Sequence, residues 1–140
     1  MQIVFAYEEV DRVSLFVVRA WKALIPACLG YFFVLLDVTI VNVSLANIGS
    51  DLGTSHEGLQ WVVDGYALVL AALMLSAGDL ADLVGRRRVF LTGLGIFGVS
   101  SVICALAPSP AVLIGGRALQ GLGAAAILPT SLAIINHAFA

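Results

Sequence analysis

Four long and nearly uninterrupted apolar runs constrain this sequence more than any other feature. They cover residues 23–46, 59–77, 89–107 and 111–135. A helix needs about 20 residues to cross a hydrocarbon core of about 30 Å, and each run has about that length. Barrel strands are shorter, at about 10 residues, and alternate in polarity, which these runs do not. The runs therefore predict an all-α integral membrane protein with four transmembrane helices.

The overall composition agrees with lipid as the solvent. Of 140 residues, 61% are hydrophobic and 11% are charged, and the net charge is −2. A soluble domain usually has about 25% charged residues, so a soluble globule is excluded. Nucleic acid is not expected as a partner, because its phosphates require a continuous basic surface that this chain lacks. The expected partner is the lipid bilayer.

Cysteine, histidine and carboxylate residues form no cluster along the sequence. Cys28 and Cys104 lie in separate apolar runs, and His56 and His137 lie far apart with no metal-ligand spacing around them. No nucleophile, base and orienting residue can be assembled. We therefore expect no metal, no cofactor and no enzymatic activity.

The basic residues predict the orientation in the membrane. All of them except Arg117 either precede the first run, as Arg12, Arg19 and Lys22 do, or lie between the second and third runs, at residues 86–88. Cytoplasmic loops are enriched in Lys and Arg. We therefore expect a multi-pass protein of the cell membrane with both termini cytoplasmic.

The first twenty residues differ in character from the rest of the chain. Residues 1–20 contain Glu8, Glu9 and Asp11 and have no basic segment of the signal-peptide kind. We expect them to form a cytoplasmic lead that is weakly structured or lies at the membrane interface. Residues 21–140 then form the membrane domain.

Three ionisable residues inside the apolar runs are the strongest functional candidates. Asp37, Asp64 and Arg117 are costly in hydrocarbon and must face protein or a watery cavity. A nearby cation and burial act oppositely on a carboxyl group, so an aspartate near Arg117 is a candidate for gaining and losing a proton. Two other interpretations stay open. Arg117 pairs permanently with one aspartate to orient the helices, or Asp64 reaches the membrane interface.

Other polar and small residues within the runs suggest further roles. Asn42, Tyr66 and Gln120 are candidates for lining a substrate path, although Tyr66, together with Trp61, also fits an aromatic belt that anchors the helix at the interface. Gly121 and Ala125 lie four residues apart in a run rich in small residues, which predicts a close helix contact.

The segment between the second and third runs carries a recognisable pattern. Residues 78–88 read Gly-Asp-Leu-Ala-Asp-Leu-Val-Gly-Arg-Arg-Arg. We expect Gly78 to allow close packing, Asp82 to lie near the start of the third helix, and Gly85 to permit a tight turn. With Arg86, Arg87 and Arg88, this segment resembles the signature loop between helices two and three of the major facilitator superfamily.

Three more segments are similar to motifs of the same superfamily. Residues 36–43 resemble the first-helix motif of its fourteen-span drug:proton antiporter branch, and residues 117–125 resemble the fourth-helix motif associated with proton coupling. Residues 61–66 are similar to the start of helix two in antibiotic-efflux members. One departure from the family pattern is Leu83, which stands where the family usually has a basic residue.

This resemblance implies a fold and a function. It implies the first part of a major facilitator N-terminal helical bundle that exports hydrophobic, often cationic, compounds in exchange for protons and confers antibiotic resistance. Asp37 and Arg117 would then be the proton-coupling residues, and Asp82 with Arg86, Arg87 and Arg88 would help latch the cytoplasmic gate.

The number of spans bears on how such a chain would work. Carriers of this kind have twelve or fourteen spans, so four spans predict an N-terminal fragment that needs further C-terminal helices as partners and does not transport alone. Two alternatives stay open: a small four-span transporter that works as a homo-oligomer, and a membrane interaction protein that transports nothing. The identity of the substrate is not encoded in these helices alone.

Overall fold

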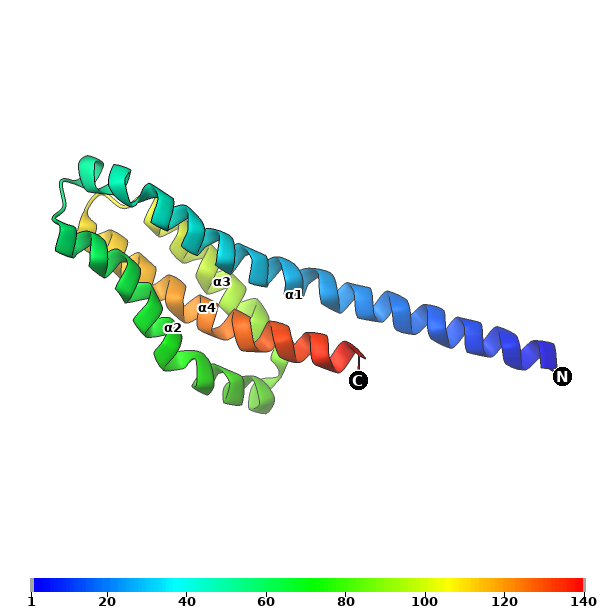
Figure 1. The fold of residues 1–140 in the computed structure, drawn as a ribbon. Coiled ribbons are helices and arrows are strands. Elements are labelled where there is room, and N and C mark those ends of the chain that lie inside the picture. The colour runs from blue at the N-terminus through cyan, green and yellow to red at the C-terminus, as the bar shows by residue number, and fades with distance from the viewer. Residues whose placement is uncertain (1, 140) are drawn as a thin grey trace.

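A computed structural model describes the backbone of residues 2–139 and the side chains of Trp21 and residues 24–136. This part of the chain folds into four helices: α1 (Gln2–Leu52), α2 (His56–Val84), α3 (Arg86–Ala105) and α4 (Pro110–Phe139) (Figure 1). Each contains a segment long and apolar enough to span a membrane: Leu24–Leu52, His56–Val84, Arg86–Ala105 and Pro110–Asn136. The prediction of an all-α, four-span protein is confirmed.

Helix α4 is the centre of the bundle and packs against the three other helices. In Figure 1 it lies between α2 and α3, with α1 crossing alongside. Six buried residues from all four helices form the core: Val34, Tyr66, Phe90, Phe97, Ala124 and Ile127. Because α4 touches every neighbour, a residue on α4 is placed to bond to several helices at once.

Close packing around α4 depends on residues without large side chains. A Cβ atom added at Gly121 would lie 2.5 Å from the Tyr66 carbonyl oxygen on α2, and one added at Gly123 would lie 2.7 Å from the Phe97 nitrogen on α3. Ala125 is fully buried. The small residues therefore let the α4 backbone approach α2 and α3 on two sides.

The expected loop at residues 78–88 is replaced by one non-helical residue. Helix α2 continues to Val84 and α3 starts at Arg86, so only Gly85 separates them. Its φ of 109° is a conformation that residues with a side chain rarely adopt. Asp82 lies in the last turn of α2, where the helix dipole does not favour an anion, and it is stabilised by Arg86 instead.

The helices also extend beyond the apolar runs. Helix α1 ends at Leu52, and the next residue, Gly53, has a φ of 58° that does not continue the helix. Ser55 caps the start of α2 by accepting a hydrogen bond from the Gly58 nitrogen. The lead expected at residues 1–20 is helical from Gln2 onward as the start of α1. Its side chains lie outside the described ones, so its interfacial role stays a prediction.

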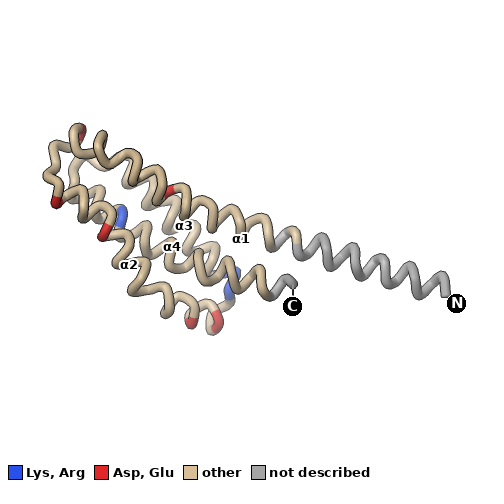
Figure 2. The backbone as a smooth tube through the Cα atoms, in the orientation of Figure 1, with Lys and Arg blue, Asp and Glu red and all other residues tan. Residues whose placement is uncertain are grey.

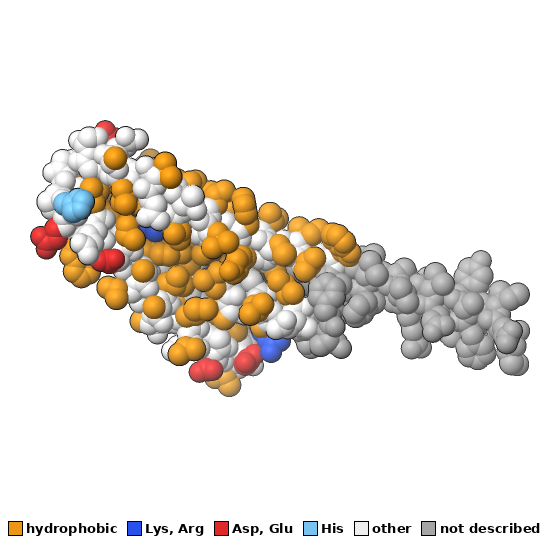
Figure 3. Space-filling model, in the orientation of Figure 1, with side chains coloured by type: hydrophobic (Ala, Val, Ile, Leu, Met, Phe, Trp, Pro, Cys, Tyr) orange, Lys and Arg blue, Asp and Glu red, His pale blue; other side chains and the backbone are white. Residues whose placement is uncertain are grey.

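Large apolar side chains cover the outside of the bundle. Val43, Leu75 and Leu83 are at least three-quarters exposed, and hydrophobic atoms spread over the visible face between the ends (Figure 3). Most of the charged residues that Figure 2 colours lie toward the two ends of the bundle. This distribution suits a protein whose middle is surrounded by lipid.

Candidate functional site

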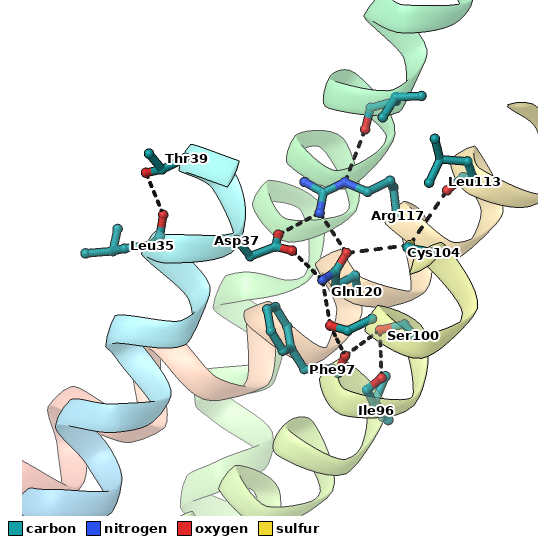
Figure 4. A network of polar contacts seen from close by, with 12 residues as sticks. Leu35, Asp37, Thr39, Ile96, Phe97, Ser100, Cys104, Leu113, Arg117 and Gln120 are labelled. Atoms are coloured by element: carbon teal, nitrogen blue, oxygen red, sulfur yellow. Dashed lines mark hydrogen bonds and ion pairs between the residues drawn. The ribbon is translucent and has the colours of Figure 1, made fainter. Parts of the chain in front are cut away.

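An ion pair between α1 and α4 forms the centre of the site. Arg117 Nη1 lies 2.6 Å from Asp37 Oδ2, and only 3% of the arginine side chain and 17% of the aspartate side chain are exposed (Figure 4). Of the two aspartates considered as partners of Arg117, the structure pairs Asp37. The pair joins residues that are 80 positions apart in the sequence, so it forms only when α1 packs on α4.

Gln120, one turn after Arg117 on α4, bonds to both members of the pair. Its Oε1 accepts a hydrogen bond from Arg117 Nη1 at 2.7 Å, and its Nε2 donates to Asp37 Oδ1 at 2.7 Å. The same Nε2 donates to Ser101 Oγ on α3 at 2.9 Å. Both oxygens of the Asp37 carboxylate therefore have a donor, and three helices contribute to the arrangement.

Tyr66 on α2 adds a fourth helix to the site. The Arg117 Cζ atom lies 4.3 Å from the centre of the Tyr66 ring, a cation–π contact, and Arg117 Nε donates to the Val62 carbonyl at 3.4 Å. Tyr66 is 4% exposed. It therefore belongs to the buried core beside Arg117, and the aromatic-belt interpretation is wrong for this residue. Trp61, half exposed, still fits a belt.

Two clefts flank the ion pair. One, of about 240 Å³, lies between α1, α3 and α4 and is lined by Asp37, Arg117 and Gln120 together with polar residues including Ser44 and Cys104. The other, of about 370 Å³, lies between α1, α2 and α4 and is mostly apolar. Asn42 and Tyr66, the other two substrate-lining candidates, line this second cleft.

Asp64 lies apart from the ion pair. It lines a separate cleft with His56 and Gln60, toward the end of the bundle where α1 connects to α2. No ion pair of Asp64 is found among the described residues. The three ionisable candidates therefore divide into one bonded pair and one residue near the helix end.

The turn between α2 and α3 holds a second aspartate–arginine pair. Arg86 lies 3.1 Å from Asp82, with 40% and 65% of their side chains exposed, and Arg86 Nη1 also donates to the Ala133 carbonyl of α4 at 3.2 Å. Arg87 and Arg88 are exposed. Gly78 lies where an added Cβ would contact Pro129 of α4 at 3.9 Å. The turn is thus tied to α4 through Arg86.

The site includes two α3 residues that sequence reasoning missed. Ser101 accepts from Gln120, and the Cys104 sulfur lies 3.8 Å from Gln120 Oε1. The two are three positions apart and so share a helix face. A polar pair at this spacing inside an apolar run is the signal that points to α3 as a contributor.

Each charge of the buried pair depends on the other. A carboxylate removed from water is maintained in its charged form by a cation and by hydrogen bonds. A proton added to Asp37 would cancel its charge and leave Arg117, almost fully buried, without a counter-ion. Because Asp37 lies on α1 and Arg117 on α4, the ion pair is a direct polar contact between these two helices.

Comparisons with known proteins give one matching family and several similar bacterial proteins that are named for drug resistance or export. Residues 27–140 match the family model of the Major Facilitator Superfamily. The chain is 50% identical over 116 residues to the multidrug resistance protein Stp of Mycobacterium tuberculosis. The matching region is 83% of this chain and 22% of that protein.

Two further relatives come from other bacteria. The cephamycin export protein CmcT of Amycolatopsis lactamdurans is 46% identical over 86% of this chain and 25% of its own length. The methylenomycin A resistance protein of Bacillus subtilis is 43% identical over 84% of this chain and 25% of its own length. The chain thus spans about a quarter of the length of these relatives.

Proposed function

Because this chain belongs to the major facilitator superfamily, we propose that its helices are the first four spans of a drug exporter that exchanges small hydrophobic or cationic compounds for protons. The observation that carries the proposal is the buried Asp37–Arg117 pair at 2.6 Å. The names of three similar proteins, which refer to multidrug resistance, cephamycin export and methylenomycin A resistance, support the substrate class.

Asp37 is the proposed proton carrier of the cycle. In the deprotonated state it holds Arg117 and Gln120, and so holds α1 against α4. When a proton neutralises Asp37, Arg117 must find another partner or reach water, because an unpaired buried charge is strongly unfavourable. Proton binding at Asp37 is thereby converted into a change in the packing of α1 on α4.

The apolar cleft beside the pair is the proposed contact for the exported compound. Val38, Leu70 and Met74 supply its apolar surface, and Asn42 and Tyr66 lie at the same cleft. An apolar surface with few polar groups selects by size and shape more than by hydrogen bonding. This suits compounds that share hydrophobicity and little else. Gln120, the third substrate-lining candidate, lies at the other cleft and bonds to both members of the ion pair.

The turn at Gly85 is the proposed cytoplasmic latch. Asp82 and Arg86 connect the α2–α3 turn to the Ala133 carbonyl of α4, and the exposed Arg87 and Arg88 suit a cytoplasmic surface. In the proposed orientation, both termini lie in the cytoplasm and the protein is in the cell membrane. Rocking of two helical halves around a midplane site would open and close this end, with the opposing half contributed by helices beyond these four.

The test is proton-driven uptake into inverted membrane vesicles that contain a carrier with this sequence. A fluorescent hydrophobic cation serves as the substrate, and the variants are Asp37→Asn and, as the matched control, Asp51→Asn at the exposed end of α1. We expect Asp37→Asn to abolish uptake driven by a pH gradient and to insert in the membrane normally, because its neutral side chain no longer takes up a proton. Asp51→Asn should behave as the parent.

Normal gradient-driven uptake by Asp37→Asn would refute the proposal. A second arm uses the 140-residue chain alone in the same vesicles, where we expect no uptake because four helices provide only one side of a transport path. Uptake by the chain alone would instead favour a homo-oligomeric four-span transporter.

A further inference from the structure

The amide of Gln120 uses all of its hydrogen-bonding capacity. A glutamine side chain has two N–H donors and one carbonyl oxygen with two lone pairs. The donors bond to Asp37 Oδ1 and Ser101 Oγ, and the oxygen faces Arg117 Nη1 and the Cys104 sulfur. Gln120 is 1% exposed, and every partner of its amide comes from the protein. The orientation of this amide therefore depends on all of its neighbours.

The Ser101 hydroxyl acts as a hydrogen-bond acceptor toward that amide. Its hydroxyl donates to the Phe97 carbonyl of its own helix at 2.8 Å. With its proton committed there, the Ser101 oxygen accepts a hydrogen bond and does not donate one to Gln120. Only the N–H side of the amide satisfies it, which directs Nε2 toward Ser101. In Figure 4 the Gln120 amide lies between the labelled Asp37 and Arg117, with Nε2 toward Asp37 and Oε1 toward Arg117.

The opposite orientation of the amide would be unfavourable for the ion pair. The amide oxygen would then face the Asp37 carboxylate, placing two acceptors together, and the amide nitrogen would face the guanidinium of Arg117, placing two donors together. Asp37 would lose the donor on its Oδ1 atom. Since hydrogen bonds to a carboxylate favour its ionised form, the amide orientation affects how tightly Asp37 binds a proton.

We propose that Ser101 is a positioning residue that fixes the Gln120 amide and thereby sets the proton affinity of Asp37. The inference rests on the proposed function only for the use of that proton in transport. Ser101 touches neither Asp37 nor Arg117 in the described contacts and acts through Gln120. It makes α3 a participant in proton binding at a site whose charges come from α1 and α4.

Other titratable groups that face Asp37 are the same in the parent and in the test variants. Arg117 faces it from α4 at 2.6 Å. Tyr66 on α2 has its ring centre 4.3 Å from Arg117 Cζ, and the Cys104 sulfur on α3 lies 3.8 Å from Gln120 Oε1. None of these groups is replaced when Ser101 is changed, so a change in proton binding by Asp37 reports on the hydrogen bond to Gln120.

Ser100 provides a matched control on the same helix. It is 1% exposed, and its hydroxyl bonds only to the Ile96 and Phe97 carbonyls of α3. Ser100→Ala and Ser101→Ala therefore remove the same atom from adjacent positions, of which Ser100 is buried and Ser101 is partly buried. Only the second removes a partner of Gln120.

The experiment is an infrared titration of the 140-residue chain in lipid nanodiscs. Infrared spectra distinguish a protonated carboxyl group from a carboxylate, and subtraction of the Asp37→Asn spectrum isolates the signal of Asp37. We expect Ser101→Ala to move the titration midpoint of Asp37 by about half a pH unit or more toward higher pH, a fraction of the effect of losing a whole charge-assisted hydrogen bond. Ser100→Ala and the hydroxyl-retaining Ser101→Thr should keep the parental midpoint.

A midpoint for Ser101→Ala equal to that of Ser100→Ala would overturn the inference. If Ser101→Ala does not fold, as judged by circular dichroism, Gln120→Met takes its place. It removes the amide and should move the midpoint at least as far in the same direction, and an unchanged midpoint there would equally overturn it. Because the titration involves no transport, failure of the inference and failure of the proposed exchange of drugs for protons are separate results.

Discussion

Two aspartate–arginine pairs in this molecule have the same chemistry and opposite surroundings. Asp37–Arg117 is buried at the centre of the bundle, with contacts of 2.6 to 2.7 Å to each other and to Gln120. Asp82–Arg86 lies at the α2–α3 turn, at 3.1 Å, with both side chains substantially exposed. The buried pair joins distant parts of the sequence, whereas the exposed pair joins residues four positions apart.

The difference indicates which pair is able to respond strongly to one proton. At an exposed site, water screens the charges and compensates when one of them is lost, so such pairs contribute about 0–1 kcal/mol. At a buried site, the loss of one charge leaves the other without compensation, which costs about 3–5 kcal/mol. Loss of the aspartate charge is therefore expected to cost far more at the Asp37–Arg117 pair than at the Asp82–Arg86 pair.

The largest expected effect comes from removing the cation of the buried pair. Arg117→Met keeps the length and apolar volume of the side chain but leaves Asp37 without its counter-ion. We expect a loss of about 3–5 kcal/mol in unfolding free energy, measured by denaturant titration in mixed micelles with tryptophan fluorescence. Addition of Asp37→Asn should restore part of the loss, because the unpaired charge is then removed. A loss under about 1 kcal/mol for Arg117→Met would contradict the burial assigned to the pair.

An intermediate effect is expected from the packing that supports the buried pair. Gly121→Val places a branched side chain against the Tyr66 carbonyl, where even a Cβ lies at 2.5 Å. Overpacking of this kind costs about 1–3 kcal/mol, and it should separate Tyr66 from Arg117. Gly115→Val is the control, because nothing lies within 4 Å of a Cβ at that position. Thermal unfolding should distinguish the two variants, and equal melting temperatures would show that the close α2–α4 contact is absent.

The smallest effect is expected at the exposed pair. Asp82→Asn removes one charge from a site where both side chains reach solvent, so we expect a loss of less than about 1 kcal/mol. The loss should shrink further at high salt because exposed charges are screened. The same denaturant titration, performed at two salt concentrations, checks this. A loss as large as that of Arg117→Met would remove the distinction between the two pairs.

Much of the fold was predictable from the sequence, for simple reasons. Long apolar runs form helices in lipid because a helix satisfies its own backbone hydrogen bonds, so the number and type of the spans follow from length and composition. Helix ends were less predictable, because charged residues such as Asp79 and Asp82 continue α2 at its exposed end without interrupting its backbone hydrogen bonds. The single-residue break at Gly85 depends on a backbone conformation that its apolar and charged neighbours do not reveal.

The candidate site was only partly predictable. The cost of burial identifies Asp37, Asp64 and Arg117 as residues that need partners, but periodicity along one helix does not show which helix faces which. The choice of Asp37 over Asp64, and the burial of Tyr66 against Arg117, depend on how α1 and α2 pack around α4. The role of Ser101 was not predictable, because a serine in an apolar span usually bonds to its own helix, as Ser100 does.

The most direct test of the central claim is a pair of double-mutant cycles that compares the two aspartate–arginine pairs. One cycle combines Asp37→Asn with Arg117→Met, and the other combines Asp82→Asn with Arg86→Met, with unfolding free energy as the common measurement. We expect a coupling energy of about 2 kcal/mol or more for the buried pair and under about 1 kcal/mol for the exposed pair. Equal coupling energies, or a buried pair with none, would contradict it.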